Sequence, residues 1–230
     1  MLVLHGFTSC PQSVRPLAHA LAGAGYTVEL PLLPGHGTTP DDMATTTWDD
    51  WAAGALSAYD ELSARCDRVA VAGLSLGGAL AALIAAERPS TAAVIAVNPG
   101  VEPPVAAVLE AITALADAGT ERIDAVANDV ADPSVRELAY ESTPVACVLS
   151  LFDGQAKLVP RLADITCPVL IATSRQDHLV MNSSSELLAS AVAGPVERLW
   201  LERSYHVATI DYDHELIEQT AVAFLARVLP

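Results

Sequence analysis

The stretch Gly73-Leu74-Ser75-Leu76-Gly77-Gly78 decides the fold of this chain. Residues 68–72 before it form a short apolar, partly β-branched run, which predicts a buried strand. The alanine- and leucine-rich residues 79–86 after it predict a helix. A serine in a G-x-S-x-G pattern between a strand and a helix is typical of a sharp turn that presents a nucleophilic hydroxyl. Such a turn has no room for side chains two residues before or after the serine, which explains Gly73 and Gly77.

The five-residue pattern by itself also fits an ordinary turn between a strand and a helix, so the rest of the chain has to support the catalytic interpretation. At 230 residues the chain fits one large α/β domain with a sizeable core. No apolar run reaches the roughly 18 residues of a membrane span, and no signal peptide is visible. The net charge of −16 argues against nucleic acid and anionic membranes as partners.

The four cysteines are scattered, without a C-x-x-C pair or a cluster with histidine. This usage predicts free thiols, a cytoplasmic location and neither a disulfide framework nor a metal site. No cofactor is expected.

Short apolar runs that end in loops predict six strands. They cover residues 2–4, 26–30, 68–72, 91–97, 167–172 and 196–201. Helical patterns lie between them, at residues 13–24, 47–66, 79–88, 183–193 and 213–229, with Thr47, Ser183 and Asp213 as expected N-caps. Strands that are apolar throughout and alternate with helices predict a parallel sheet covered on both faces. We therefore expect an α/β fold with a mostly parallel sheet of at least six strands.

The alternation stops between residues 101 and 166. Helical runs at 105–118, 123–130, 135–140 and 155–162 are interrupted by prolines, and no run predicts a core strand. We interpret this segment as a small helical cap inserted over one end of the sheet, within a single domain of residues 1–230.

A serine hydroxyl needs a base to take its proton, and the base needs an acid to fix its tautomer. In a parallel sheet the reacting groups should follow the carboxyl ends of strands. Ser75, Asp177 and His206 each follow a predicted strand, in the chain order expected with this turn. The backbone N–H groups of Leu76 and Phe7 are the expected donors to a developing oxyanion.

Other residues compete for the roles of base and acid. His5 and His36 lie in loops that suit a structural role, His19 and His214 on helices, and His178 directly beside Asp177. The competing acids are Asp153 and Asp164 in the insertion, Asp211 close after the base, and Glu102 near the end of the 91–97 strand. Glu102 is the main alternative, because some hydrolases draw their acid from that strand.

Five motifs together carry a family resemblance: Leu4-His-Gly-Phe-Thr8, Pro34-Gly-His-Gly37, Gly73 to Gly78, Gln176-Asp177 and Ser204-Tyr-His-Val207. In order and spacing the chain resembles the α/β-hydrolase superfamily, and within it the small bacterial carboxylesterases and monoacylglycerol lipases. The resemblance implies Ser75 as nucleophile, His206 as base, Asp177 as its acid and the Phe7 and Leu76 amides as oxyanion hole.

Two features depart from the family pattern. Relatives usually have one or two strands before the His-Gly-Phe loop, so either the sheet is short at this edge or the sequence is truncated. Tyr205 stands where many relatives have glycine, which we expect to narrow the mouth of the site.

The leading hypothesis is a serine esterase that acts on monoacylglycerols or on short- to medium-chain acyl esters. The same catalytic groups would also serve C–C bond hydrolysis, thioester hydrolysis or acyl transfer. A non-catalytic ligand-binding protein is the alternative from another class. The sequence does not decide the oligomeric state.

Overall fold

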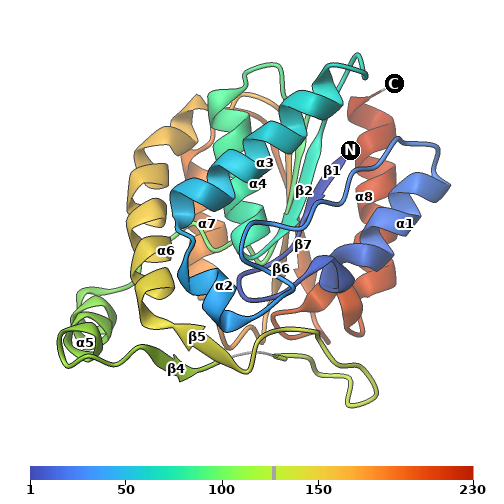
Figure 1. Cartoon of the computed structure of the whole chain (residues 1–230). Coiled ribbons are helices and arrows are strands. Elements are labelled where there is room, and N and C mark those ends of the chain that lie inside the picture. The colour runs from blue at the N-terminus through green and yellow to red at the C-terminus, as the bar shows by residue number, and fades with distance from the viewer. Residues whose placement is uncertain (126–127, 230) are drawn as a thin grey trace.

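The computed structural model describes residues 1–125 and 128–229. Within these residues the main sheet has five parallel strands in the order β1-β2-β3-β6-β7 (Figure 1). They are β1 (Leu2–Leu4), β2 (Val71–Leu74), β3 (Val94–Val97), β6 (Val169–Ser174) and β7 (Val196–Leu201). Because every strand runs the same way, their carboxyl ends meet at one edge, where parallel α/β sheets place their ligands.

The sheet has one strand fewer than the sequence predicts. Residues 26–30 were expected to form a strand, but they make a single parallel bridge, between Leu2 and Glu29. Prolines at 31 and 34 follow, and a proline has no N–H to donate to a ladder. The segment therefore leaves the edge of the sheet after one residue, and the prediction of at least six strands is wrong by one.

Helices cover both faces of the sheet, as predicted (Figure 1). One face packs against α1 (Arg15–Gly23) and α8 (His214–Val228) through strand residues such as Val3 and Ile95. The other face packs against the remaining long helices of the body through the alternate strand residues, such as Val71 and Ile171. Those helices are α3 (Trp48–Ser63), α4 (Leu76–Glu87) and α7 (Asn182–Ala191). Both sets of strand residues are apolar because both faces are covered.

Of the three predicted N-caps, only the first has the expected hydrogen bonds. The Asp50 carboxylate accepts from the Thr47 N–H at 2.9 Å and from its hydroxyl at 2.8 Å, at the start of α3. Helix α7 begins at Asn182, so Ser183 lies inside it and is not its cap. Asp213 precedes α8, but its carboxylate accepts the N–H groups of Arg203 and Ser204 instead of a helix amide.

The inserted segment at 101–166 is less helical than the sequence indicates. Its elements are α5 (Ala106–Asp117), β4 (Arg122–Asp124), β5 (Ser142–Pro144), α6 (Val145–Leu158) and a 3₁₀ helix at Val159–Asp164. Strands β4 and β5 form an antiparallel pair outside the main sheet, so the segment adds no core strand. A short helix, α2 (Pro40–Ala44), was not predicted, and it packs beside β5.

Two helices expected in this segment are wrong. The one predicted at 123–130 begins inside β4, and its residues 126 and 127 lie outside the described part of the chain. Residues 135–140 form a loop. Asn128 adopts a left-handed backbone with φ 65°, which a helix does not allow, and the Tyr140 N–H donates to the Thr8 carbonyl at 3.0 Å instead of to a carbonyl one helical turn earlier.

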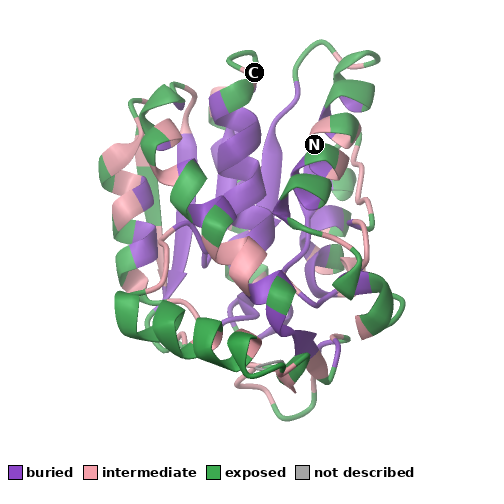
Figure 2. Cartoon of the chain, turned by 60° about the vertical axis from the view of Figure 1, so that its left-hand side comes forward, coloured by how far each residue is buried: buried purple, intermediate pink, exposed green. Residues whose placement is uncertain are grey.

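Burial differs sharply between the sheet body and the insertion (Figure 2). Strands β1, β2, β3 and β6 and helix α4 are buried almost throughout, whereas the edge strand β7 has one buried residue and α5 has none. In residues 1–125 and 128–229, no helix combines the length and apolar character needed to cross a membrane.

Candidate active site

The turn at Ser75 is built by two close backbone approaches. Ser75 has φ 55° and ψ −114°. This backbone conformation costs energy for every residue type except glycine. A Cβ on Gly73 would lie 2.1 Å from the carbonyl oxygen of Gly77, and a Cβ on Gly77 would lie 2.2 Å from that of Leu4. Glycine is therefore required on both sides, as the sequence indicates. The Ser75 N–H donates to the Val97 carbonyl at 3.0 Å, which ties the strained turn to β3.

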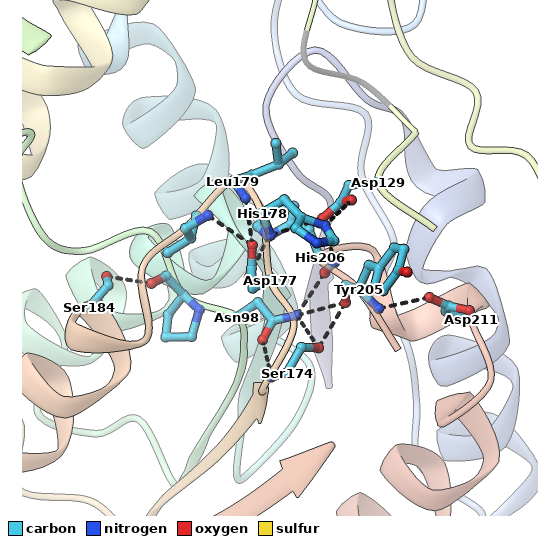
Figure 3. A network of polar contacts seen from close by, with 12 residues as sticks. Asn98, Asp129, Ser174, Asp177, His178, Leu179, Ser184, Tyr205, His206 and Asp211 are labelled. Atoms are coloured by element: carbon cyan, nitrogen blue, oxygen red, sulfur yellow. Dashed lines mark hydrogen bonds and ion pairs between the residues drawn. The ribbon is translucent and has the colours of Figure 1, made fainter. Parts of the chain in front are cut away.

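His206 and Asp177 form a buried pair at the same edge of the sheet (Figure 3). The His206 Nδ1 lies 2.8 Å from Asp177 Oδ2, and their side chains are 7% and 2% exposed. The Oδ1 atom of Asp177 accepts the N–H groups of Leu179 at 2.9 Å and Val180 at 2.8 Å. An ionised carboxylate only accepts, so Nδ1 donates and Nε2 is left as the basic nitrogen.

Ser75 and His206 line one cavity of about 340 Å³. No hydrogen bond joins their side chains in the described residues, and such contacts often tighten only when substrate binds. Asp177 reaches the cavity through His206. The structure thus brings together the three residues that the sequence singles out.

The two expected oxyanion donors are available. Leu76 is the first residue of α4, and the described residues offer no acceptor to its N–H or to that of Phe7. Thr8, directly after Phe7, has φ 61°. Left-handed non-glycine residues in the described chain are Thr8, Ser75, Asn98 and Asn128. The first three follow β1, β2 and β3, so the backbone strain is concentrated at the edge that holds the site.

Asn98 supports the loop that carries His206. Its Nδ2 donates to the His206 carbonyl at 2.7 Å and to Ser174 Oγ at 2.9 Å, and its Oδ1 accepts the Ser174 N–H at 2.7 Å (Figure 3). The Ser174 hydroxyl donates to the Tyr205 carbonyl at 2.8 Å. The ends of β3 and β6 therefore fix the backbone beside the histidine.

Two carboxylates beside His206 were not assigned to the site from the sequence. Asp129, in the insertion, accepts the His206 N–H at 3.0 Å. Asp211, considered only as a competing acid, is 1% exposed and accepts the Tyr205 N–H at 2.9 Å. The rule that site residues follow the carboxyl ends of strands could not identify Asp129, because the insertion adds no strand to the main sheet. The same rule could have identified Asn98, since it follows β3 directly.

The competing histidines have other partners. His5 accepts the Leu33 N–H at 3.1 Å, and burial lowers its pKa to about 3. His36 contacts the Pro34 carbonyl at 2.9 Å, and burial lowers its pKa to about 4. His214 pairs with Glu218 at 2.9 Å and His178 with Asp129 at 2.8 Å. His19 is exposed on α1.

The competing acids other than Asp211 have partners elsewhere. Glu102 accepts the Ser183 hydroxyl on α7. Asp153 and Asp164 form exposed ion pairs with Lys157 and Arg161. Within the described ranges, no group of three or more His, Cys, Asp or Glu side chains is arranged to hold a metal ion.

Tyr205 does not line the cavity. Its ring packs edge-on against His178, with centroids 4.5 Å apart, and His178 lines the cavity in its place. Any narrowing by Tyr205 therefore acts through the His178 ring.

Comparison with known proteins identifies the family. The family described as serine aminopeptidase, S33, matches residues 1–213. The chain belongs to this family of serine α/β-hydrolases. It is 39% identical to a thermostable monoacylglycerol lipase from Bacillus sp. (strain H-257), over 99% of this chain and 90% of that protein. It is 26% identical to a carboxylesterase from Bacillus subtilis (strain 168), over 99% and 92% of the two chains.

The fold is shared with a solved lipolytic enzyme. A structure from work on LipS and LipT, two metagenome-derived lipolytic enzymes, superposes with a TM-score of 0.93 at 41% identity. The match covers 98% of this chain and 92% of the other. These relatives place the chain among the serine ester hydrolases.

Proposed function

We propose that this chain hydrolyses monoacylglycerols and short- to medium-chain acyl esters through an acyl-enzyme on Ser75. The observation that carries the proposal is the buried Asp177–His206 pair, whose histidine shares a cavity with a serine on a strained turn. Relatives that are lipases and carboxylesterases support the choice of ester substrates.

The proposed reaction has two halves. His206 Nε2 takes the proton of Ser75 while the serine oxygen attacks the ester carbonyl. The N–H groups of Phe7 and Leu76 stabilise the negative oxygen of the intermediate, and each such donor is typically worth about 10²–10³ in rate. His206 then gives the proton to the departing alcohol. In the second half His206 activates a water that releases the carboxylic acid and regenerates Ser75.

The lining of the cavity supports a neutral ester with an apolar acyl group and a hydroxylated alcohol. The apolar lining residues are Phe7, Leu74, Ile123, Val148, Leu151, Leu179 and Val180. Polar side chains of Thr8, Asp124, Glu137, Thr143 and His178 complete it. The volume of about 340 Å³ is at the small end for small-molecule sites, which favours short and medium acyl chains.

We also propose that residues 101–166 act as a cap, within a single domain of residues 1–230, because β4, β5 and α6 supply Ile123, Asp124, Thr143, Val148 and Leu151 to the cavity. The four free cysteines are typical of a reducing compartment, which supports a cytoplasmic location. The net charge of −16 supports a small neutral substrate over nucleic acid.

The test is hydrolysis of a p-nitrophenyl ester series and of monoacylglycerols by wild type, Ser75→Ala and an exposed control, Ser190→Ala. We expect Ser75→Ala to lose at least about 10³-fold in kcat and Ser190→Ala to match wild type. A fluorophosphonate probe should label the wild-type protein at Ser75. Peptide mass spectrometry can identify the labelled residue. Equal turnover by Ser75→Ala and wild type would contradict the proposal.

A further inference from the structure

We propose that Asp129 is a positioning residue for the proposed reaction: it clamps the loop that carries His206 to the loop that carries Asp177. This inference rests on the roles proposed above for those two residues. Asp129 lies in the insertion, far in sequence from both loops, and its carboxylate reaches between them (Figure 3).

The two carboxylate oxygens of Asp129 take three donors from two loops. Oδ2 accepts the N–H of His206 at 3.0 Å and the N–H of His178 at 3.2 Å. Oδ1 lies 2.8 Å from the His178 ring Nδ1. His178 is the residue directly after Asp177. The carboxylate thus holds the backbone of the base and the backbone next to the acid against one another, while Asp177 and His206 meet through their side chains.

The position of Asp129 is itself fixed on several sides. Its carbonyl accepts the Val207 N–H at 3.0 Å, so the contact to the histidine loop is double. Asp211, nearly fully buried, accepts the N–H groups of Ala131 at 2.8 Å and Asp132 at 3.0 Å, and that of Tyr205 on the same loop. With a side chain only 13% exposed, Asp129 makes its hydrogen bonds largely shielded from water.

Catalysis depends on this geometry because the imidazole has to face Ser75 and Asp177 at once. A displacement of about 1 Å in such a group can cost about 10²-fold in rate. Without Asp129, two backbone N–H groups and one ring nitrogen lose their acceptor. The contacts that then hold the two loops together include the acid–base contact, the edge-on packing of the His178 and Tyr205 rings and the hydrogen bond from Ser174 to the Tyr205 carbonyl. We expect the loss to affect the chemical step more than the binding of substrate.

Three substitutions at Asp129 test the clamp. Asp129→Ala removes all the acceptors, and we expect kcat to fall by about 10–100-fold with KM changed much less. Asp129→Asn keeps one acceptor oxygen for the two backbone N–H groups, so we expect kcat within about threefold of wild type. Asp129→Glu keeps the charge but moves it by one methylene, and we expect it to resemble Asp129→Ala. Rescue by asparagine but not by glutamate separates positioning from a charge effect.

The matched control is Asp132→Asn on the same segment, where the carboxylate accepts hydrogen bonds from the N–H and the hydroxyl of Ser134. We expect it to keep the wild-type kcat. If Asp129→Ala does not fold by circular dichroism, the comparison of Asp129→Asn with Asp129→Glu decides the question. Wild-type kcat in both Asp129→Glu and a folded Asp129→Ala, or equal losses in Asp129→Asn and Asp129→Glu, would overturn the clamp.

The outcome is separable from that of the proposed function. If wild type hydrolyses esters and Ser75→Ala does not, unchanged Asp129 variants refute the clamp alone. If Ser75→Ala is as active as wild type, the proposed function itself fails.

Discussion

Helices α4 and α5 have the same length of twelve residues and similar alanine- and leucine-rich sequences, yet their environments are opposite. Eleven residues of α4 are buried, from Leu76 to Ala86, whereas α5 has none. The difference arises from what precedes each helix. Helix α4 directly follows β2, and Gly77 in its first turn lets it approach Leu4 of β1 closely, whereas α5 begins in a proline-containing loop of the insertion. Composition therefore predicts a helix, and the backbone contacts of its first turn decide whether the sheet covers it.

The largest loss of stability should come from adding a side chain at the point where α4 lies closest to the sheet. In Gly77→Ala the new methyl group would lie 2.2 Å from the carbonyl oxygen of Leu4. Because neither backbone can yield cheaply, we expect a loss of more than about 4 kcal/mol in the free energy of unfolding and no active enzyme. Urea unfolding followed by circular dichroism measures it. Near-wild-type stability would show that α4 tolerates a shift away from β1.

A matched leucine pair compares the two helices directly. Leu80 on α4 is 0% exposed and Leu109 on α5 is 43% exposed. Leu80→Ala should cost about 2–5 kcal/mol because it leaves a cavity in a packed core. Leu109→Ala should stay within about 0.5 kcal/mol of wild type because its side chain is already half in water. If Leu80→Ala and Leu109→Ala lowered the urea midpoint of unfolding equally, α5 would have to be covered in solution.

Lowering the pH below 7 should destabilise the sheet body through its buried histidines. The insertion contains no histidine and should not be destabilised in this way. Burial lowers the pKa of His5 to about 3 and that of His36 to about 4, from 6.5 in the unfolded chain. Between these values the unfolded chain binds protons that the folded chain does not, so stability falls as the pH falls below 6.5. From pH 7 to pH 5.5 we expect the two rings to remove about 2–3 kcal/mol.

Proton NMR of the imidazole rings checks this expectation without interference from the carboxylates. The signals of His5 and His36 should not titrate above about pH 5 in the folded protein. Titration of the two buried rings near 6.5 would contradict it.

The parts of the fold that the sequence predicts are those set by local chemistry. Gly73 is required by the close approach of Gly77, four residues away, so the turn and its flanking strand and helix could be inferred directly. The same is true of Thr47, whose partner Asp50 is three residues away. The rule that parallel strands end at one edge then selected Asp177 and His206, which the structure joins at 2.8 Å.

The sequence predicts less where distant segments decide the structure. Residues 26–30 have strand-like composition, but only one of them reaches the edge of β1. Asp129 contacts residues 49 and 77 positions further along the chain, and nothing in its neighbourhood marks it. Ser183 has a capping pattern, yet α7 starts one residue earlier and its hydroxyl binds Glu102. In each case a tertiary contact replaced a local preference.

The chain leaves the sheet at the end of β3 and returns in β6, which pairs directly with β3, with Val97 beside Ala172. The insertion thus closes a loop whose two ends are already neighbours. The entropy of closing such a loop grows only with the logarithm of its length, about 0.6 kcal/mol for each doubling. Loop closure therefore sets little limit on the length of the segment. The end of the insertion places Leu158, Leu162 and Ile165 in the core, so only the exposed part around α5 could be exchanged at small thermodynamic cost. The rest of the insertion has to keep these core side chains for folding and, under the clamp proposed above, the carboxylate of Asp129 for catalysis.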